Sequence, residues 1–295
     1  MEYGLFKECI LEAMKERFGE NCNIEYREVL KNNGIRLDGL VVRFDESGIS
    51  PTVYVNDYHQ MYEEGESLDS ICDRIEGIIR GNSLEKDFDA NSLIDFDKVK
   101  DNIVFKLINY GKNTDLLKDI PHKQFLDLAI VYYISIDEKV LESATILINN
   151  THLMMWEKDA EEIDALARKN APRLLKAELK SMAETLSEML GFEDEYQFDD
   201  DECNMYVLSN EKKHFGASVI LYENMMKEIC KKLEGNVYIL PSSVHETILI
   251  PSRMVDTVSR LDEMVCEVNE TQVPTVDILS DHSYLYNMEK ECFEY

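Results

Sequence analysis

The sequence predicts an α+β protein with a mostly antiparallel sheet and flanking helices, in two closely packed parts. Short β-branched runs bounded by Gly and Pro indicate strands, and the turn at Asn33-Gly34 is typical of an antiparallel hairpin. Apolar stripes with helical spacing lie between these runs without the regular alternation of a doubly wound parallel sheet. The 295 residues suffice for two ordinary domains, and we expect parts at 1–88 and 89–295.

The first part is expected to place helices and antiparallel strands next to one another. Asn56-Asp57 and Ser67 have the residue types that cap helix N-termini, and Gly19 has the type that ends a helix. Polar residues without a period make 81–92 the predicted linker. In order, we expect a helix at 2–18, strands at 23–30, 35–44 and 52–55, a short helix ending at Gly65, and a helix after Ser67 with the stripe Leu68, Ile71, Cys72, Ile75, Ile78 and Ile79.

The second part is expected to mix strands with longer helices. Asn170-Ala171-Pro172 should break the longest helical region, because proline lacks the N–H donor and disfavours helix at the preceding residue. In order, we expect a short helix from 96, strands at 103–110, 125–135 and 144–149, helical segments at 153–170 and 175–190, strands at 205–209 and 217–221, a helix at 223–233, strands at 237–240 and 247–250, a helix capped by Ser252, and a last strand at 283–287.

The composition of the chain limits the classes of partner that the protein is expected to bind. Fifty-nine acids against 31 bases give a formal net charge of -28. Such a chain repels nucleic-acid backbones and anionic membranes, so we expect neither as a partner and favour a protein, in particular a basic one. The longest apolar run is too short for a membrane helix. The seven scattered cysteines and the absence of a signal-peptide pattern at the N-terminus predict a reducing, cytoplasmic location.

No motif for a cofactor or a metal ion occurs in the sequence. Phosphate-binding glycine loops, H-E-x-x-H and G-x-S-x-G are all absent, and no cysteine spacing suits zinc. The acidic run 193–202 lacks the central glycine of a calcium loop, and we interpret it as a solvated loop. We therefore expect no cofactor and no bound metal.

The stretch 235–251 holds the densest group of candidate catalytic residues. Ser242, His245 and Glu246 have the types of a nucleophile, a base and an orienting carboxylate. Ser243 and Glu246 also fit the capping-box pattern, which favours a structural turn between two buried strands. If a strand begins there, His245 and Glu246 point to opposite faces and cannot bind one metal ion together.

Asp281 and His282 form a second candidate group. Brought near His245, they could complete a metal site with two histidines and a carboxylate. The alternative is a turn before the last strand, in which Asp281 bonds its own backbone. The sequence favours the turn.

With these segments described, the chain resembles a bacterial domain-of-unknown-function family of gut-dwelling Gram-positive anaerobes. The resemblance implies a cytosolic protein, sometimes associated with mobile elements, and carries no activity over to any position. Glu157 departs from the glycine usual in similar sequences, which affects a local turn. The matching stretches are VLKNNGIRLDGLVVR (29–43), PTVYVNDYHQMYEEGESL (51–68), ILINN (146–150) with Trp156 and ARKNAP (167–172), MYVLSN (205–210), GASVILY (216–222), ILPSSVHETILIP (239–251) and VNETQVPTVDILSDHSYLY (268–286).

Three functions follow as hypotheses. The first is a non-enzymatic binding or interaction protein, favoured by complete fold signals without a strong catalytic motif. The alternative is a hydrolase or metal-dependent enzyme that uses His245, Glu246, Asp281 and His282. The second alternative is a DNA-mimic inhibitor, since acidic surfaces can occupy a nucleic-acid-binding groove. The sequence leaves the ligand and the oligomeric state open.

Overall fold

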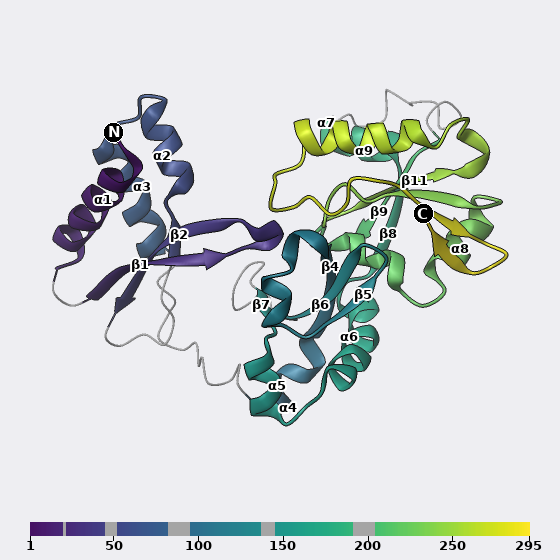
Figure 1. Ribbon diagram of the computed structural model, residues 1–295, viewed down its shortest axis with the longest axis horizontal. Helices are drawn as coiled ribbons and strands as arrows, with labels where there is room; N and C mark the ends of the chain where they lie inside the picture. The colour runs from purple at the N-terminus through teal and green to yellow at the C-terminus, as the bar shows by residue number, and fades with distance from the viewer. Residues whose placement is uncertain (20–21, 45–51, 82–94, 137–144, 191–203) are drawn as a thin grey trace. The chain divides into compact units, whose positions relative to one another are not determined.

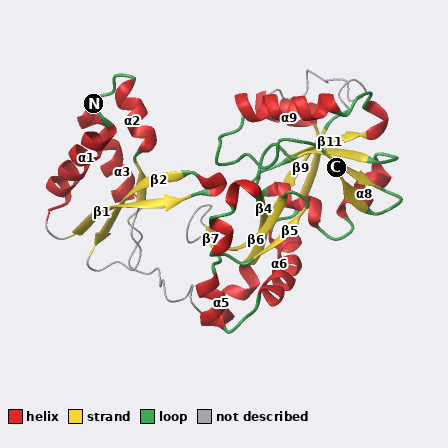
Figure 2. Ribbon diagram, viewed as in Figure 1, coloured by secondary structure: helices red, strands yellow, loops and turns green. Residues whose placement is uncertain are grey.

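The structure, a computed structural model, confirms the α+β class, with antiparallel sheets and helices (Figures 1 and 2). It describes residues 1–19, 22–44, 52–81, 95–136, 145–190 and 204–295. Two compact units are formed by Met1–Asp95 and Phe96–Tyr295. The predicted boundary at residue 88, most of the predicted linker and the acidic run 193–202 lie outside the described residues.

The first unit is a three-stranded antiparallel sheet with helices on one face. The strand order is β1-β2-β3, and the core holds Phe6, Ile10 and Met14 of the first helix with Leu40 and Val42 of the central strand. Its elements are α1 (Tyr3–Phe18), β1 (Cys22–Leu30), β2 (Arg36–Phe44), β3 (Thr52–Tyr54), α2 (Asn56–Glu63) and α3 (Leu68–Gly81).

The predicted hairpin is present, and its turn has the expected backbone. Asn33 and Gly34 have φ angles of 60° and 70°, and Ile35 N–H donates to the Asn32 carbonyl at 3.5 Å. Two consecutive positive φ angles define the turn type that asparagine and glycine tolerate.

One local prediction in the first unit is wrong, and another holds only in part. Asn56 does not cap α2; its side-chain oxygen accepts from the Asp38 N–H at 2.9 Å and joins the helix start to β2. The predicted stripe on α3 is buried except at its margins, where Ile78 is 39% exposed. Ser67 does cap α3, since its hydroxyl accepts from Ser70 N–H at 3.2 Å.

The second unit contains two antiparallel sheets. One has the order β4-β6-β5, with β7 also paired to β6, and the other has the order β13-β12-β10-β11-β9-β8. Its main elements are α4 (Phe96–Val99), β4 (Ile103–Asn109), β5 (His122–Phe125), β6 (Leu128–Ser135), β7 (Thr145–Leu147), α5 (Asn150–Trp156), α6 (Ala160–Leu174), β8 (Ala177–Ser181), α7 (Met182–Leu190), β9 (Tyr206–Asn210), the 3-10 helix η7 (Gly216–Leu221), α8 (Met225–Lys232), β10 (Val237–Leu240), β11 (Thr247–Pro251), α9 (Ser259–Thr271), β12 (Tyr284–Asn287) and β13 (Cys292–Glu294).

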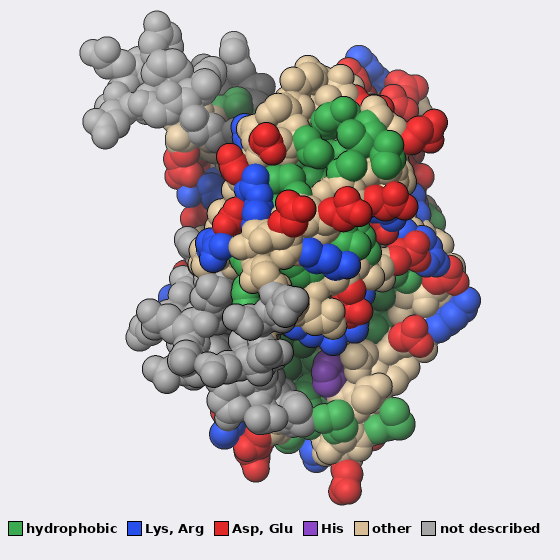
Figure 3. Space-filling model, turned by 90° about the vertical axis from the view of Figure 1, so that its left-hand side faces the viewer, with side chains coloured by type: hydrophobic (Ala, Val, Ile, Leu, Met, Phe, Trp, Pro, Cys, Tyr) green, Lys and Arg blue, Asp and Glu red, His purple; other side chains and the backbone are tan. Residues whose placement is uncertain are grey.

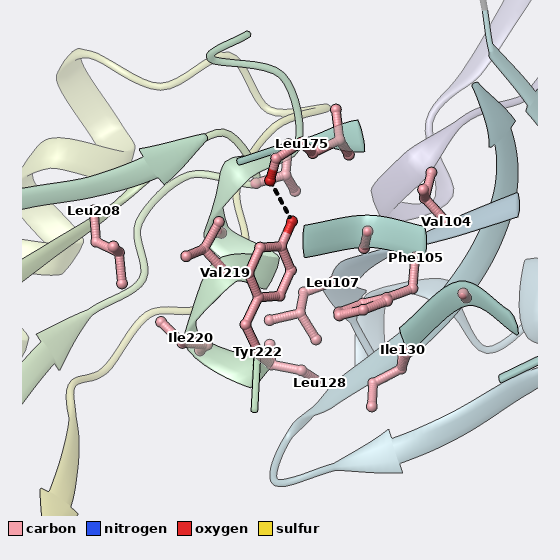
Figure 4. Close-up of a cluster of buried hydrophobic side chains, with 14 of the residues drawn as sticks. Val104, Phe105, Leu107, Leu128, Ile130, Leu175, Leu208, Val219, Ile220 and Tyr222 are labelled. Atoms are coloured by element: carbon pink, nitrogen blue, oxygen red, sulfur yellow. Dashed lines mark hydrogen bonds between the residues drawn. The ribbon is translucent and has the colours of Figure 1, made fainter. Parts of the chain in front are cut away.

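One large apolar core joins the two sheets. Phe105 and Ile130 of the smaller sheet and Leu208 of the larger sheet pack with side chains of η7 in this core (Figure 4). At its centre, the buried Tyr222 hydroxyl donates to the Leu175 carbonyl at 2.8 Å. Burial of this ring and satisfaction of its hydroxyl fix η7 between the sheets.

The opposite face of the six-stranded sheet has its own smaller core. Leu240 of β10 and Ile250 of β11 pack there against Leu261 and Val265 of α9. Further along this face, α7 follows directly on β8. The two helices leave part of the sheet surface uncovered, which is where the open grooves described below lie.

Several predicted elements of the second unit differ from the observed ones. The predicted strand 125–135 is the end of β5, a turn and β6, and the predicted strand 217–221 is the 3-10 helix η7. Pro172 lies inside α6, where the Asn170 side chain donates to the carbonyls of Lys100 (2.8 Å) and Ile103 (3.0 Å) and anchors the helix. Ser252 starts a short 3-10 helix, and α9 begins only at Ser259.

The predicted helix 175–190 is a strand followed by a helix. Ala177–Ser181 forms β8 and pairs with β9, and α7 starts at Met182. Ser181 and Glu184 form a capping box: Ser181 Oγ accepts from Glu184 N–H at 3.1 Å, and Glu184 Oε2 accepts from Ser181 N–H at 2.7 Å. The S-x-x-E pattern at Ser181 is the sequence feature that marks the end of β8 and the start of α7.

Among the described helices, none is both long enough and apolar enough to cross a membrane. The six cysteines that the structure describes are free thiols.

Candidate functional site

The segment between β10 and β11 pairs with a second segment ahead of β12. Val244 N–H donates to the Asp277 carbonyl at 2.9 Å, and Leu279 N–H donates to the Ser242 carbonyl at 3.0 Å. Ser243 and Ile278 form an isolated antiparallel bridge. The segments that contain the two groups of candidate residues are therefore neighbours, and their pairing fixes where each side chain lies.

Ser242 and Ser243 are both buried, with 8% and 6% of their surface exposed. Ser243 Oγ accepts from the His245 N–H at 3.0 Å. This bond to a residue two positions on closes a local turn. The predicted capping box between Ser243 and Glu246 does not form, because extended β11 rather than a helix follows. Ser209 of β9 closes the turn by donating its hydroxyl to the His245 carbonyl at 2.7 Å.

His245 is held from both ring nitrogens. Its Nδ1 accepts from the Phe215 N–H at 3.3 Å, which leaves the proton of the neutral ring on Nε2. Nε2 lies 3.4 Å from Asp277 Oδ1. The ring also stacks on Phe215 with a centroid distance of 5.7 Å. These contacts orient the imidazole between η7 and the paired segment.

A second histidine, His214, lies beside this ring, with 5.6 Å between the centroids. Burial, followed by the nearby His245 and Lys106, lowers the pKa of His214 to about 4. Its Nε2 is buried without a hydrogen-bond partner among the described residues. His214 is therefore a neutral, largely desolvated ring at neutral pH.

His282 belongs to a different cluster, centred on Asp127. Asp127 Oδ2 accepts from the Ser280 hydroxyl at 2.9 Å, and Oδ1 accepts from the Tyr284 hydroxyl at 2.5 Å. His282 Nε2 lies 3.5 Å from Asp127 Oδ1, and its Nδ1 lies 3.1 Å from the exposed Asp281 carboxylate. Burial, with the hydrogen bond to Asp127, raises the pKa of the Tyr284 phenol.

The Ser280, His282 and Asp127 side chains have the types of a hydrolytic triad but not its arrangement. In a triad the serine hydroxyl donates to the histidine and faces the substrate. Here the Ser280 hydroxyl donates to the carboxylate at 2.9 Å and lies farther, 3.4 Å, from His282 Nδ1, and Ser280 is fully buried. The geometry ties the chain before β12 to the turn between β5 and β6.

The structure does not bring the four candidate residues His245, Glu246, Asp281 and His282 into one site. His245 contacts Asp277, whereas His282 contacts Asp127. Across the described ranges, no group of three or more His, Cys, Asp or Glu side chains could hold a metal ion.

Glu246, but not His245, lines an open groove of about 430 Å³. The floor is apolar: Ile248 of β11 pairs with Val207 of β9, and Val207 pairs with Lys180 of β8. Met182 and Thr185 of α7 form one wall. Pockets of this size with an apolar floor and a few charged groups are typical ligand sites.

The rim of the groove carries charges of both signs. Lys180 Nζ lies 3.1 Å from Glu178 and 2.7 Å from Glu188, and Lys213 lies 3.8 Å from Glu188. The charged residues that line the groove are Glu178 and Glu246 against Lys180 and Lys213, and Glu188, which pairs with both lysines, is not part of the lining. The groove is therefore amphipathic, and no cation of the described residues lies within 4.0 Å of the Glu246 carboxylate.

Sequence reasoning missed Asp127, Asp277 and Phe215. Asp127 lies 155 residues from His282, and Asp277 and Phe215 lie 32 and 30 residues from His245, and no local pattern marks them. The S-x-x-E pattern at Ser181 does mark the end of β8 in the sequence, but not its pairing with β9.

The fold is that of an α+β protein. The polar groups of the clusters around His245 and His282 mostly bond one another, and the open site is the groove on a sheet face. The chain matches, over residues 3–288, the model of a family of unknown function, DUF5688, and belongs to that family. Comparison with curated proteins and with solved structures gave no match.

Proposed function

We propose that the protein is a non-enzymatic binding protein and that the groove over β8, β9 and β11 takes an extended segment of a basic partner protein. The single observation that carries this proposal is the groove of about 430 Å³, which combines an apolar floor with a charged rim. The apolar floor would take one large side chain of the partner. The Glu246 carboxylate on the rim, which has no cation within 4.0 Å among the described residues, favours basic residues beside that side chain.

The charge of the whole chain supports a cationic partner. A net charge of -28 raises the rate of encounter with basic segments and disfavours acidic ones. On the face shown in Figure 3, however, basic side chains lie among the acidic ones. A DNA mimic needs a continuous run of carboxylates, and this face does not carry one.

The polar clusters give less support to the hydrolase alternative. The hydroxyl of Ser280 is committed to Asp127, and the Nδ1 of His245 is committed to a backbone N–H. A general base needs a free lone pair aimed at the substrate.

We propose a cytoplasmic location, because the seven cysteines are scattered along the chain as expected in a reducing compartment.

Selection from a phage-displayed library of random dodecapeptides tests the proposal. We expect enrichment of peptides in which an apolar or aromatic residue is flanked by Lys or Arg. The affinity of a selected peptide, measured by fluorescence anisotropy, should fall about 10-fold or more for the double variant Glu178→Lys, Glu246→Lys, which reverses the charge of the rim. It should also fall as salt is raised.

The matched control is the pair Glu234→Lys, Glu270→Lys, which changes the net charge equally at residues outside the groove. An equal loss of affinity in this control would show that only overall charge matters. Enrichment of acidic peptides, or turnover in a broad hydrolase screen without any peptide enrichment, would contradict the proposal.

A further inference from the structure

A second open cavity, of about 280 Å³, lies on the same sheet face at the start of α9. Ile250 of β11 and Leu261 of α9, each 5% exposed, contribute apolar side chains to its lining. Met205, Met254 and Met264 complete the apolar wall. Methionine side chains are unbranched and adaptable, so such a wall fits a flexible aliphatic chain.

The mouth of the cavity carries one cationic and one anionic side chain. Arg260 is the one cationic side chain that lines it, and no carboxylate in the described part of the chain lies within 4.0 Å of its guanidinium. Arg260 also lies in the first turn of α9, a helix of 13 residues whose start has no side-chain cap. The positive end of the helix dipole adds to the charge of the guanidinium. Asp256 lines the same mouth and opposes this attraction.

We propose that this cavity binds a free medium-chain carboxylate, with the carboxylate at Arg260 and the aliphatic chain against the three methionines. A volume of about 280 Å³ equals roughly nine water-sized volumes, which suits a ligand of about ten non-hydrogen atoms. Octanoate has that size and one negative charge. This site is separate from the proposed peptide groove and does not depend on it.

Methionine-methyl NMR on the full chain tests the site. The protein is labelled with 13C at its methionine methyl groups and titrated with sodium octanoate below its micelle concentration. We expect saturable shifts of the signals of Met205, Met254 and Met264, while most of the 13 methionines stay unchanged. Octan-1-ol, which lacks the charge, should bind about 10-fold more weakly.

Three variants separate the parts of the proposal. Arg260→Gln should weaken octanoate about 10-fold and leave octan-1-ol unchanged, and Met254→Trp should weaken both by filling the mouth. Arg36→Gln, in the first unit, removes the same charge elsewhere and should change neither affinity. Since Met254 is 49% exposed, its substitution leaves the buried core intact.

Three results would overturn the inference. One is an absence of shifts in the three named methyl signals. Another is a shift of all methionine signals together, which would indicate a detergent-like effect. The third is equal affinity for octanoate and octan-1-ol, or an equal loss in Arg36→Gln, which would remove the role of Arg260.

Discussion

Replacing Gly216 with alanine places one methyl group where η7 meets β9. The added Cβ would clash with Ser209 Oγ and would lie 2.5 Å from the His245 carbonyl oxygen and 2.7 Å from Asn210 N. Two of these three neighbours are backbone atoms of paired segments, which cannot move aside as a flexible side chain does. The substitution must therefore shift η7 or break the local hydrogen bonding.

The cost can be worked from these contacts. Overpacking of a buried site costs about 1–3 kcal/mol. Displacing Ser209 also loses its hydrogen bond to the His245 carbonyl, worth about 1 kcal/mol. We expect Gly216→Ala to lower the free energy of unfolding by about 2–4 kcal/mol.

Urea unfolding followed by tryptophan fluorescence measures this change in the second unit, to which Gly216 belongs. Trp156 is the one tryptophan of the chain, and its side chain is buried in the core of the second unit. With a urea dependence of about 2–3 kcal/mol per M, the midpoint should fall by about 0.7–2 M. Gly111→Ala is the control, because the nearest atom to its added Cβ lies 3.6 Å away. Equal midpoints for the two variants would refute the reasoning.

Two further predictions concern a turn and a buried ring. Glu157 ends α5 with a φ of 54°, so Glu157→Gly should raise the free energy of unfolding by up to about 1 kcal/mol, and an unchanged or lower urea midpoint would contradict the strain argument. The pKa of His214 lies near 4 in the folded chain, below its ordinary value near 6.5, so the unfolded state binds more protons between these pH values and stability falls as pH falls through that window. Between pH 7 and 5 this contribution should cost about 1–2 kcal/mol, and His214→Gln should show a correspondingly smaller loss; identical pH dependence in both proteins would exclude His214 as the cause.

Local patterns in the sequence predicted those elements that local chemistry determines. The hairpin at Asn33-Gly34 and the strands on either side of Ser242 form as expected. The predictions failed where partners distant in the chain decide the structure. Segment 217–221 is a short run that is apolar except for Ser218, so its pattern cannot distinguish a strand from a buried 3-10 helix. Pro172 stays in α6 because Asn170 binds a segment about 70 residues away.

The candidate site was predictable only in part. The expectation that His245 and Glu246 do not share a site holds, since Glu246 lines the groove and His245 contacts Asp277, although β11 begins only at Thr247. The partners of His245 and His282 do not follow, because Asp277 and Asp127 reach them through sheet pairing and not through sequence spacing. The clusters come from tertiary contacts, which one sequence does not reveal.

The bonds that Asp127 makes with Ser280 and Tyr284 bear on how the second unit forms during synthesis. They join residues 153 and 157 positions apart. At a translation rate of about 5–20 residues per second, the turn that carries Asp127 would wait about 8–30 s for these partners. Over that interval the apolar side chains of β4 and β6 would lack the sheet that later covers them, so the newly made chain should depend on chaperones more than the finished protein does.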